Sequence, residues 1–227
     1  MSTVELQSSF SRIEIAATAI DLLPQKAAYL PEHHCLLVAD AHLGKAVSFR
    51  KLGVPVPRGT TAETLELLSS LIAATGADRV VFLGDFLHSE RSHAASTLGA
   101  MARWREAHAG LEITLVRGNH DDRAGDPPDL LNVRCVDEPV HLGNLALCHH
   151  PRAVEGAYVL AGHWHPCVGV WGGRAYDHLR LPCFWMGPRV GVLPAFGSFT
   201  GMHPIARAPG DRVFAIVDER VVELPAA

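Results

Sequence analysis

Five short apolar runs in this chain of 227 residues are each followed by polar residues rich in aspartate and histidine. In chain order, these polar segments are Asp40-Ala41-His42, Gly84-Asp85, Gly118-Asn119-His120-Asp121, His149-His150 and Gly162-His163-Trp164-His165. Short apolar runs with polar boundaries are typical of buried strands. Because strand ends in an α/β protein meet along one edge of a sheet, where ligands bind, the pattern predicts that these side chains gather at a common rim.

Helical patterns lie between the early apolar runs and favour an α/β fold. Strands are expected at Cys35–Ala39, Arg79–Leu83 and Leu111–Val116, and helices at Thr60–Ala74 and His93–His108. The first helix is expected to be capped by Thr60 or Thr61 and to end at Gly76. After Asp137 short strands dominate, at Leu145–Cys148, Tyr158–Ala161, Val168–Trp171 and Val213–Val217. The chain length favours a single domain over residues 1–227.

The region 166–199 is dense in glycine, proline and aromatic residues. Such a composition indicates a hairpin-rich second sheet that packs on the first. A second interpretation, compatible with the first, is that its loops also shape a groove for the substrate.

The rim residues predict a dinuclear metal site. Seven potential ligands occur in the polar segments: Asp40, His42, Asp85, Asn119, His149, His163 and His165. Seven ligands are too many for one tetrahedral ion but suit two ions that share a carboxylate, for which Asp85 is the candidate. Four imidazoles with three oxygen donors favour Mn²⁺, Fe or Zn²⁺ over Mg²⁺ and Ca²⁺. Two such ions outweigh two carboxylates in charge, so the site should attract phosphate and hydrolyse it with a bridging hydroxide.

Two further residues of the third segment are candidate catalytic groups. His120 follows Asn119 directly, so its side chain should point elsewhere and approach the scissile phosphate as a cation or proton donor. Asp121 is expected to hold the His120 ring and keep it protonated. Beyond Gly84-Asp85, His88 and Arg91 form either a polar loop or a contact with the substrate phosphate.

The charge and cysteine content limit the other function classes. The formal net charge is −4, with only three lysines, so composition gives no support for binding to nucleic acid. The five cysteines form no C-x-x-C pair, which favours a reducing compartment, and we expect a cytoplasmic protein. The opening residues lack the pattern of a secretory leader, and no apolar stretch is long enough to span a membrane.

The ordered set D-x-H, GD, GNHD, H and GHxH resembles the calcineurin-like metallophosphoesterase superfamily. This resemblance implies a four-layer α/β/β/α sandwich, a dinuclear centre built from the seven ligands above, and a catalytic role for His120. At the fourth block either His149 or His150 could be the ligand; His149 is preferred because it follows the apolar run directly.

Three longer segments look like the ligase-associated DNA-damage-response metallophosphoesterases of bacteria: residues 39–61, RLPCFW at 180–185 and LPAFGSFTG at 193–201. This resemblance implies a Mn²⁺-dependent phosphodiesterase that acts as an endonuclease on DNA, with single-stranded DNA as the expected form. It also implies functional association with an ATP-dependent DNA ligase, a helicase-like protein and an exonuclease-like protein. Arg50, Arg58, Arg91 and Arg123 are candidates for local contacts with a single strand. The alternative is the same centre acting on a small phosphodiester or phosphomonoester.

Overall fold

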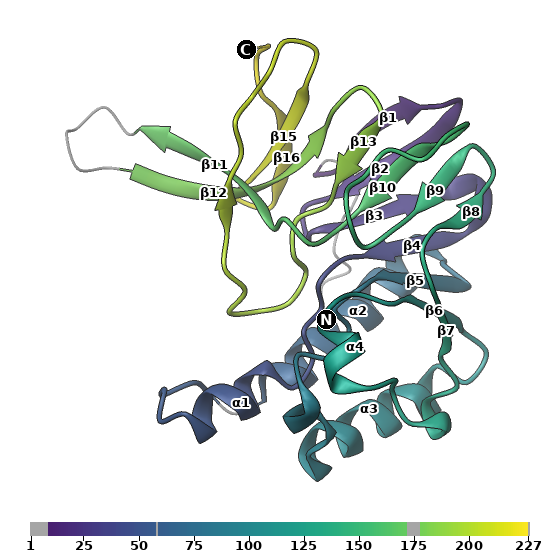
Figure 1. The fold of residues 1–227 in the computed structure, drawn as a ribbon, viewed down its shortest axis with the longest axis vertical. Coiled ribbons are helices and arrows are strands. Elements are labelled where there is room, and N and C mark those ends of the chain that lie inside the picture. The colour runs from purple at the N-terminus through teal and green to yellow at the C-terminus, as the bar shows by residue number, and fades with distance from the viewer. Residues whose placement is uncertain (1–8, 58, 172–177, 227) are drawn as a thin grey trace.

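Two β-sheets stack face to face, and helices cover the outer face of the first sheet (Figure 1). The structure is a computed structural model that describes residues 9–57, 59–171 and 178–226. The first sheet contains its strands in chain order: β1 (Ser11–Ile15), β2 (Thr18–Leu23), β3 (Ala27–Leu30), β4 (Cys35–Val38), β5 (Arg79–Leu83), β6 (Glu112–Val116) and β7 (Arg134–Val136). Strands β1 to β4 pair antiparallel, and β4 to β7 pair parallel.

The helices lie between the parallel strands of the first sheet and return the chain from one strand to the next. They are α1 (Lys45–Lys51), α2 (Thr60–Thr75), α3 (Ala95–Ala107) and α4 (Asp121–Ala124), with short 3₁₀ turns at Pro31–His33 (η2), Glu90–His93 (η3) and Asp129–Leu131 (η4). Helix α2 buries Leu65, Leu68 and Leu71 against Phe82 of β5 and Met101 of α3. This spacing presents one apolar stripe to the sheet.

The second sheet is built from the later part of the chain. Its strands are β8 (Val140–Leu142), β9 (Leu145–Leu147), β10 (Tyr158–Ala161), β11 (Pro166–Trp171), β12 (His178–Met186), β13 (Val190–Val192), β14 (His203–Pro204), β15 (Arg212–Val217) and β16 (Arg220–Glu223). The main path runs β14-β11-β12-β13-β10-β9-β8, and β15 pairs with both β12 and β16. Strands β9, β10 and β13 are parallel to one another.

An apolar core joins the two sheets. Leu37, Val81 and Leu83 of the first sheet pack in one cluster with Leu160 and Phe184 of the second. The region 166–199 therefore contributes to a second sheet packed on the first, as predicted. The predicted α/β class is confirmed, but among the described residues the layers are helix, sheet and sheet. No helix follows η4 there, because the chain runs through short, directly connected strands, so the fourth, helical layer has no counterpart.

Local details differ from the sequence prediction. Thr60 is the first residue of α2, and Gly59 precedes it in a left-handed conformation without a side-chain capping bond. The predicted threonine cap is therefore wrong, whereas the end at Gly76 is confirmed. The sequence prediction also omits strands β1 to β3 and helix α1, whose short segments show no clear period of apolar and polar residues.

The polar segments leave the sheets at adjacent strand ends. Those after β4, β5 and β6 leave the parallel part of the first sheet, and those after β9 and β10 leave parallel strands of the second. The five cysteines are free thiols. No helix among the described residues is long and apolar enough to cross a membrane.

The core between the sheets predicts a stability difference between two substitutions. Phe184 is 0% exposed, so Phe184→Ala should lower the free energy of unfolding by about 3–5 kcal/mol, because it leaves a cavity between the sheets. Val222→Ala on the 44% exposed surface of β16 is the control and should change it by less than about 0.5 kcal/mol. Urea denaturation measures both; similar values would contradict the assignment of the core.

Candidate metal centre

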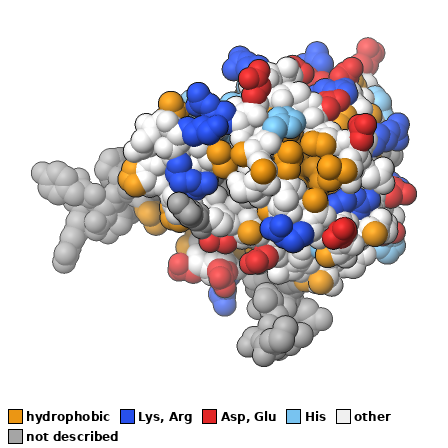
Figure 2. All heavy atoms as spheres, turned by 90° about the horizontal axis from the view of Figure 1, so that it is seen from below, with side chains coloured by type: hydrophobic (Ala, Val, Ile, Leu, Met, Phe, Trp, Pro, Cys, Tyr) orange, Lys and Arg blue, Asp and Glu red, His pale blue; other side chains and the backbone are white. Residues whose placement is uncertain are grey.

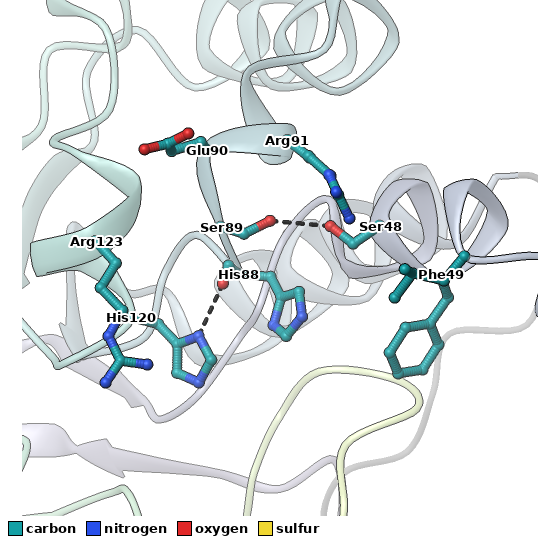
Figure 3. A pocket seen from close by; sticks show the side chains of 9 residues that line it. Ser48, Phe49, His88, Ser89, Glu90, Arg91, His120 and Arg123 are labelled. Carbon is teal, nitrogen blue, oxygen red and sulfur yellow. Dashed lines mark hydrogen bonds between the residues drawn. The ribbon is translucent and has the colours of Figure 1, made fainter.

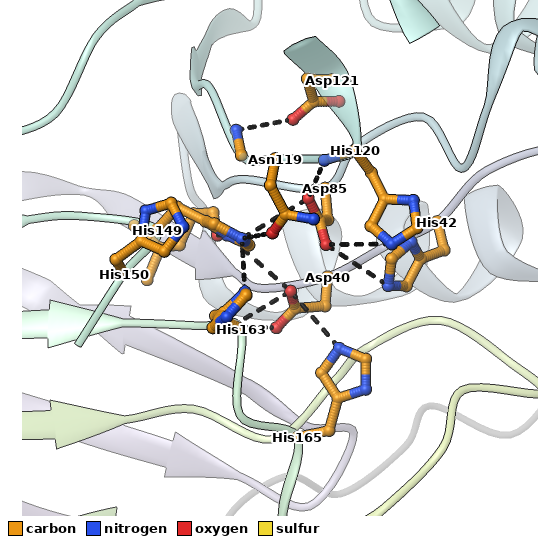
Figure 4. Close-up of polar contacts among 12 residues, drawn as sticks. Asp40, His42, Asp85, Asn119, His120, Asp121, His149, His150, His163 and His165 are labelled. Atoms are coloured by element: carbon orange, nitrogen blue, oxygen red, sulfur yellow. Dashed lines mark hydrogen bonds and ion pairs between the residues drawn. The ribbon is translucent and has the colours of Figure 1, made fainter. Parts of the chain in front are cut away.

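All seven candidate ligands lie around one point at the strand ends, where the two sheets meet (Figure 4). Asp40 and His42 follow β4, Asp85 follows β5, and Asn119 follows β6. From the second sheet, His149 follows β9, and His163 and His165 follow β10. The predicted gathering of these residues is therefore what the structure contains, and their geometry decides what they can hold.

Asp85 occupies the middle of the cluster and presents its two oxygens to different histidines. Its Oδ1 lies 3.5 Å from Nε2 of His149, and its Oδ2 lies 3.7 Å from Nε2 of His42. The backbone amide of His120 donates to Oδ1 at 2.9 Å and fixes the carboxylate plane. One carboxylate therefore separates two groups of imidazoles.

Asp40 joins the same cluster from the neighbouring strand. Its Oδ1 lies 3.5 Å from Nε2 of His165, and its Oδ2 accepts the backbone amide of His163 at 2.9 Å. Asp40, His42 and His165 have potential ligand atoms within 4.8 Å of one another, and so do Asp40, Asp85 and His149. Asn119 Oδ1 lies 3.1 Å from Nε2 of His149.

Backbone carbonyls orient several of the imidazoles. Nδ1 of His149 donates to Leu83 O at 3.0 Å, and Nδ1 of His165 donates to Gly201 O at 3.0 Å. Nε2 of each ring therefore faces the carboxylates, and a neutral ring with its proton on Nδ1 presents its Nε2 lone pair in that direction. Metal-binding histidines are commonly held in this way through their other ring nitrogen.

Burial keeps two of the rings neutral, as a metal ligand must be. Burial, with the nearby charge of Lys45, lowers the pKa of His42 to about 2. Burial also lowers the pKa of His163, and the neighbouring His149 adds to that effect. For His165, burial acts to lower the pKa, but the hydrogen bond and charge of Asp40 outweigh it and raise the value.

The donor set fits divalent cations. Asp40 and Asp85 are 0% and 3% exposed, and neither forms an ion pair with a lysine or arginine among the described residues. Around His149 Nε2, Nδ1 of His163 lies at 3.0 Å and the oxygens of Asn119 and Asp85 lie at 3.1 and 3.5 Å, so more than one acceptor crowds a single nitrogen. Nδ1 of His42 is buried without a hydrogen-bond partner. Buried charges and facing lone pairs of this kind are compensated when a metal ion lies between them.

Close packing and backbone strain hold the cluster. A β-carbon at Gly84 would overlap the ring of His149, and one at Gly118 would overlap the carboxylate of Asp85. Five of the candidate ligands have left-handed backbones, with φ between 45° and 71°: Asp40, His42, Asp85, His163 and His165. This conformation is disfavoured for residues other than glycine and collects at functional sites, where the surrounding structure enforces it.

His120 has a different orienting partner from the one predicted. Its Nδ1 donates to the carbonyl of His88 at 2.8 Å, which leaves Nε2 facing the site, 4.0 Å from Oδ2 of Asp85. The predicted contact between Asp121 and this ring is wrong. Asp121 is 1% exposed, and its carboxylate accepts the backbone amides of Leu87 and Gly118, both at 3.0 Å. The reason is that Asp121 opens α4 and faces the loop after β5, away from the His120 ring.

Glu138 separates the two histidines of the fourth segment. It accepts the backbone amides of His149 and His150 at 2.7 and 2.9 Å, and it also contacts Nδ1 of His150 at 3.1 Å. Burial acts to raise the pKa of Glu138, but these hydrogen bonds outweigh it and lower the value. The side chain of His150 is 44% exposed and lies at the edge of the cluster, with a possible ligand atom within 4.8 Å of those of His149 and His163, whereas His149 is fully buried among the carboxylates. Nothing in the sequence marked Glu138 for this role.

A cavity of about 450 Å³ opens beside His120 (Figure 3). The rings of His88 and His120 stack with centroids 5.1 Å apart, and Phe49 of α1 lies beyond His88. Burial, with the charge of Lys45, lowers the pKa of His88 to about 4. His88 therefore faces the site and does not lie in a solvated polar loop.

The candidate arginines differ in their position relative to the metal centre. Arg91 and Arg123 line the cavity beside His120. Arg50 donates to the carbonyl of Pro57 and lines a separate cavity. Arg58 lies outside the described residues. Two of the four predicted arginines are therefore placed to contact a substrate at the candidate centre.

Comparisons with known proteins identify the family of this chain. A family model described as calcineurin-like phosphoesterase matches residues 33–152. A search of curated proteins finds no match. Among solved structures, the crystal structure of Pseudomonas putida nuclease MPE is 41% identical, and the alignment covers 95% of this chain and 100% of that chain with a TM-score of 0.84. The phosphoesterase Yfce from E. coli is 18% identical over 84% of this chain and 97% of its own, with a TM-score of 0.42.

The family model spans more than half of the chain, and the first of these structures aligns with nearly all of it. The chain therefore belongs to the calcineurin-like phosphoesterase family and is a metal-dependent phosphoesterase.

Proposed function

We propose that this phosphoesterase is a phosphodiesterase with a dinuclear centre that cuts single-stranded DNA internally, with Mn²⁺ as its metal. The proposal of a dinuclear centre rests on the position of Asp85, whose two oxygens face His149 on one side and His42 on the other. The 41% identical solved structure is described as a nuclease, which supports nucleic acid as the substrate.

The ligands divide into two groups around Asp85. We assign Asp40, His42 and His165 to one ion, Asn119, His149 and His163 to the other, and Asp85 to both. Mixed nitrogen and oxygen donors of this kind suit Mn²⁺, Fe or Zn²⁺. When bound, two such ions lower the pKa of a shared water and stabilise the charge on the attacking and leaving oxygens.

The remaining groups at the site act on the phosphate and the leaving oxygen. Nδ1 of His120 is tied to the carbonyl of His88, so a protonated ring would present its Nε2–H to the site. In that position it can donate a proton to the departing oxygen. Arg91 and Arg123 line the same cavity, and their guanidinium groups can bind phosphate oxygens.

The surface charge suits local contacts with one strand better than a long basic track. On the face shown in Figure 2, lysine and arginine side chains are interspersed with aspartate and glutamate. The formal net charge of −4 agrees with this mixture. Affinity for DNA would then come mainly from the metal ions and the arginines that line the cavity, with few phosphate contacts elsewhere.

We further propose that the enzyme works in a DNA-repair system with an ATP-dependent DNA ligase, a helicase-like protein and an exonuclease-like protein. An internal cut leaves new strand ends, which the other activities of such a system would process and rejoin. The cytoplasm is the compartment that we propose for it.

Circular single-stranded DNA tests the proposed substrate. With Mn²⁺ the circles should open to linear strands and then shorten, and EDTA should stop the reaction. Because a circle offers no end to an exonuclease, its opening shows an internal cut. Gel electrophoresis measures the products. Intact circles alongside rapid turnover of bis(p-nitrophenyl) phosphate would contradict the proposal and favour a small phosphodiester as substrate.

The shared role of Asp85 predicts a joint loss of metal and activity. Asp85→Ala should reduce the bound Mn²⁺ below two ions per chain and lower turnover by more than about 100-fold, since removing even an outer partner of a ligand costs 10- to 100-fold. The exposed Asp78 precedes β5 at its opposite end, and Asp78→Ala is the matched control. Metal analysis by mass spectrometry measures the stoichiometry. Two ions retained in Asp85→Ala would rule out the shared role.

The orientation of His120 predicts a dependence on the leaving group. His120→Ala should slow cleavage of DNA, whose alkoxide leaving group needs a proton, by about 100-fold more than cleavage of p-nitrophenyl esters, whose leaving group does not. His141→Ala, at an exposed position of β8, is the control. Steady-state kinetics on both substrates give the ratio. Equal losses on the two substrates would remove the proton-donor role from His120.

A further inference from the structure

The loop 197–201 is fastened to the metal centre at both of its ends. The backbone amide of Gly197 donates to the carbonyl of Asp40 at 3.2 Å, and the carbonyl of Gly201 accepts Nδ1 of His165 at 3.0 Å. A β-carbon at Gly197 would overlap the backbone of Ala41, so this end of the loop packs directly on the strand exit that carries Asp40. Phe199 lies between these two ends, so contacts with residues of the metal centre hold its loop on both sides.

The exposure and the backbone conformation of Phe199 are both energetically unfavourable, and the packing of the core does not account for either. Phe199 is 50% exposed, although burial of its aromatic ring would stabilise the protein. Its φ is +59°, a left-handed conformation that is disfavoured for a bulky side chain. Strain of this kind persists where neighbouring contacts enforce it, and it collects at binding sites.

Phe199 lines two hollows, each of which also includes a histidine of the metal centre. One is a cavity of about 160 Å³ that Phe199 lines together with Lys26 and His165. The other is a crevice of only about 10 Å³, which Phe199 lines with His42 and Lys45. Each hollow thus combines the exposed ring, a histidine of the centre and a lysine. This is the combination of apolar face and positive charge that single-stranded nucleic acid binds.

We propose that Phe199 is a stacking platform for an unpaired base next to the scissile phosphate, a role that rests on the nuclease function proposed above. The base lies against the Phe199 ring, and the lysines face the flanking phosphates. Bases in a duplex already stack on one another and are unavailable to the ring, so the platform selects single strands. The residue determines substrate choice and takes no part in the bond cleavage.

The test compares Phe199→Ala and Phe199→Trp with the unchanged protein on two strands of equal length. One is oligothymidylate, and the other is the same strand with abasic residues in place of the thymidines. Phe199→Ala should lower kcat/KM on oligothymidylate about tenfold, within the range of roughly 5- to 150-fold that stacking of one base on an aromatic ring corresponds to. Phe199→Trp should restore it. On the abasic strand all three proteins should be alike, because no base is present to stack.

A binding measurement without catalysis accompanies the kinetics. With Mn²⁺ present and strands that carry non-hydrolysable phosphate analogues, Phe199→Ala should weaken binding of oligothymidylate by a similar factor and should quench the fluorescence of a 2-aminopurine strand less than the unchanged protein does. Leu130→Ala is the matched control, since Leu130 is 63% exposed and lines neither hollow. It should match the unchanged protein in every assay.

The outcomes separate the two proposals. If the unchanged protein cuts oligothymidylate and Phe199→Ala cuts and binds it equally well, the stacking platform is overturned. The platform is also overturned if Phe199→Ala loses as much on the abasic strand as on oligothymidylate, because the loss then has nothing to do with bases. If the unchanged protein cuts no single strand at all, the proposed nuclease function itself is overturned.

Discussion

Two buried carboxylates dominate the physical chemistry of this protein. Asp40 and Asp85 are almost fully excluded from water, and no lysine or arginine pairs with either among the described residues. Burying an ionised carboxylate costs several kcal/mol unless a cation compensates it. The imidazoles around the pair are oriented with their free nitrogens toward it, and two of them are kept neutral by burial. The cluster is therefore arranged for cations that the chain itself does not supply.

The fold makes this arrangement possible by bringing two sets of parallel strand ends together. The apolar core between the sheets fixes their distance, and glycines at 84 and 118 let the side chains of His149 and Asp85 approach the backbone. Left-handed backbones at five candidate ligands turn their side chains inward at a cost of roughly 1–2 kcal/mol each. The rest of the fold must outweigh that strain, which a rigid, two-sheet core can do.

The sequence predicted the gathering of the seven residues because their segments follow apolar runs, which form neighbouring strands within each sheet; the packing that joins the ends of the two sheets comes from the fold. It predicted neither the partner of His120 nor the contacts of Asp121, since side-chain direction depends on dihedral angles and on distant carbonyls such as that of His88. Glu138 gave no signal for the same reason: its partners are backbone amides eleven and twelve residues away. The assignment of the seven residues as ligands stays a prediction that the geometry supports.

The central claim is that Asp85 is shared between two metal ions. Anomalous diffraction from crystals grown with Mn²⁺ tests it most directly, because the anomalous signal locates each ion without reference to the chain. We expect two peaks about 3.5–4 Å apart, with Asp85 contacting both, Asp40, His42 and His165 around one, and Asn119, His149 and His163 around the other. A single peak, or two peaks of which only one contacts Asp85, would contradict the claim.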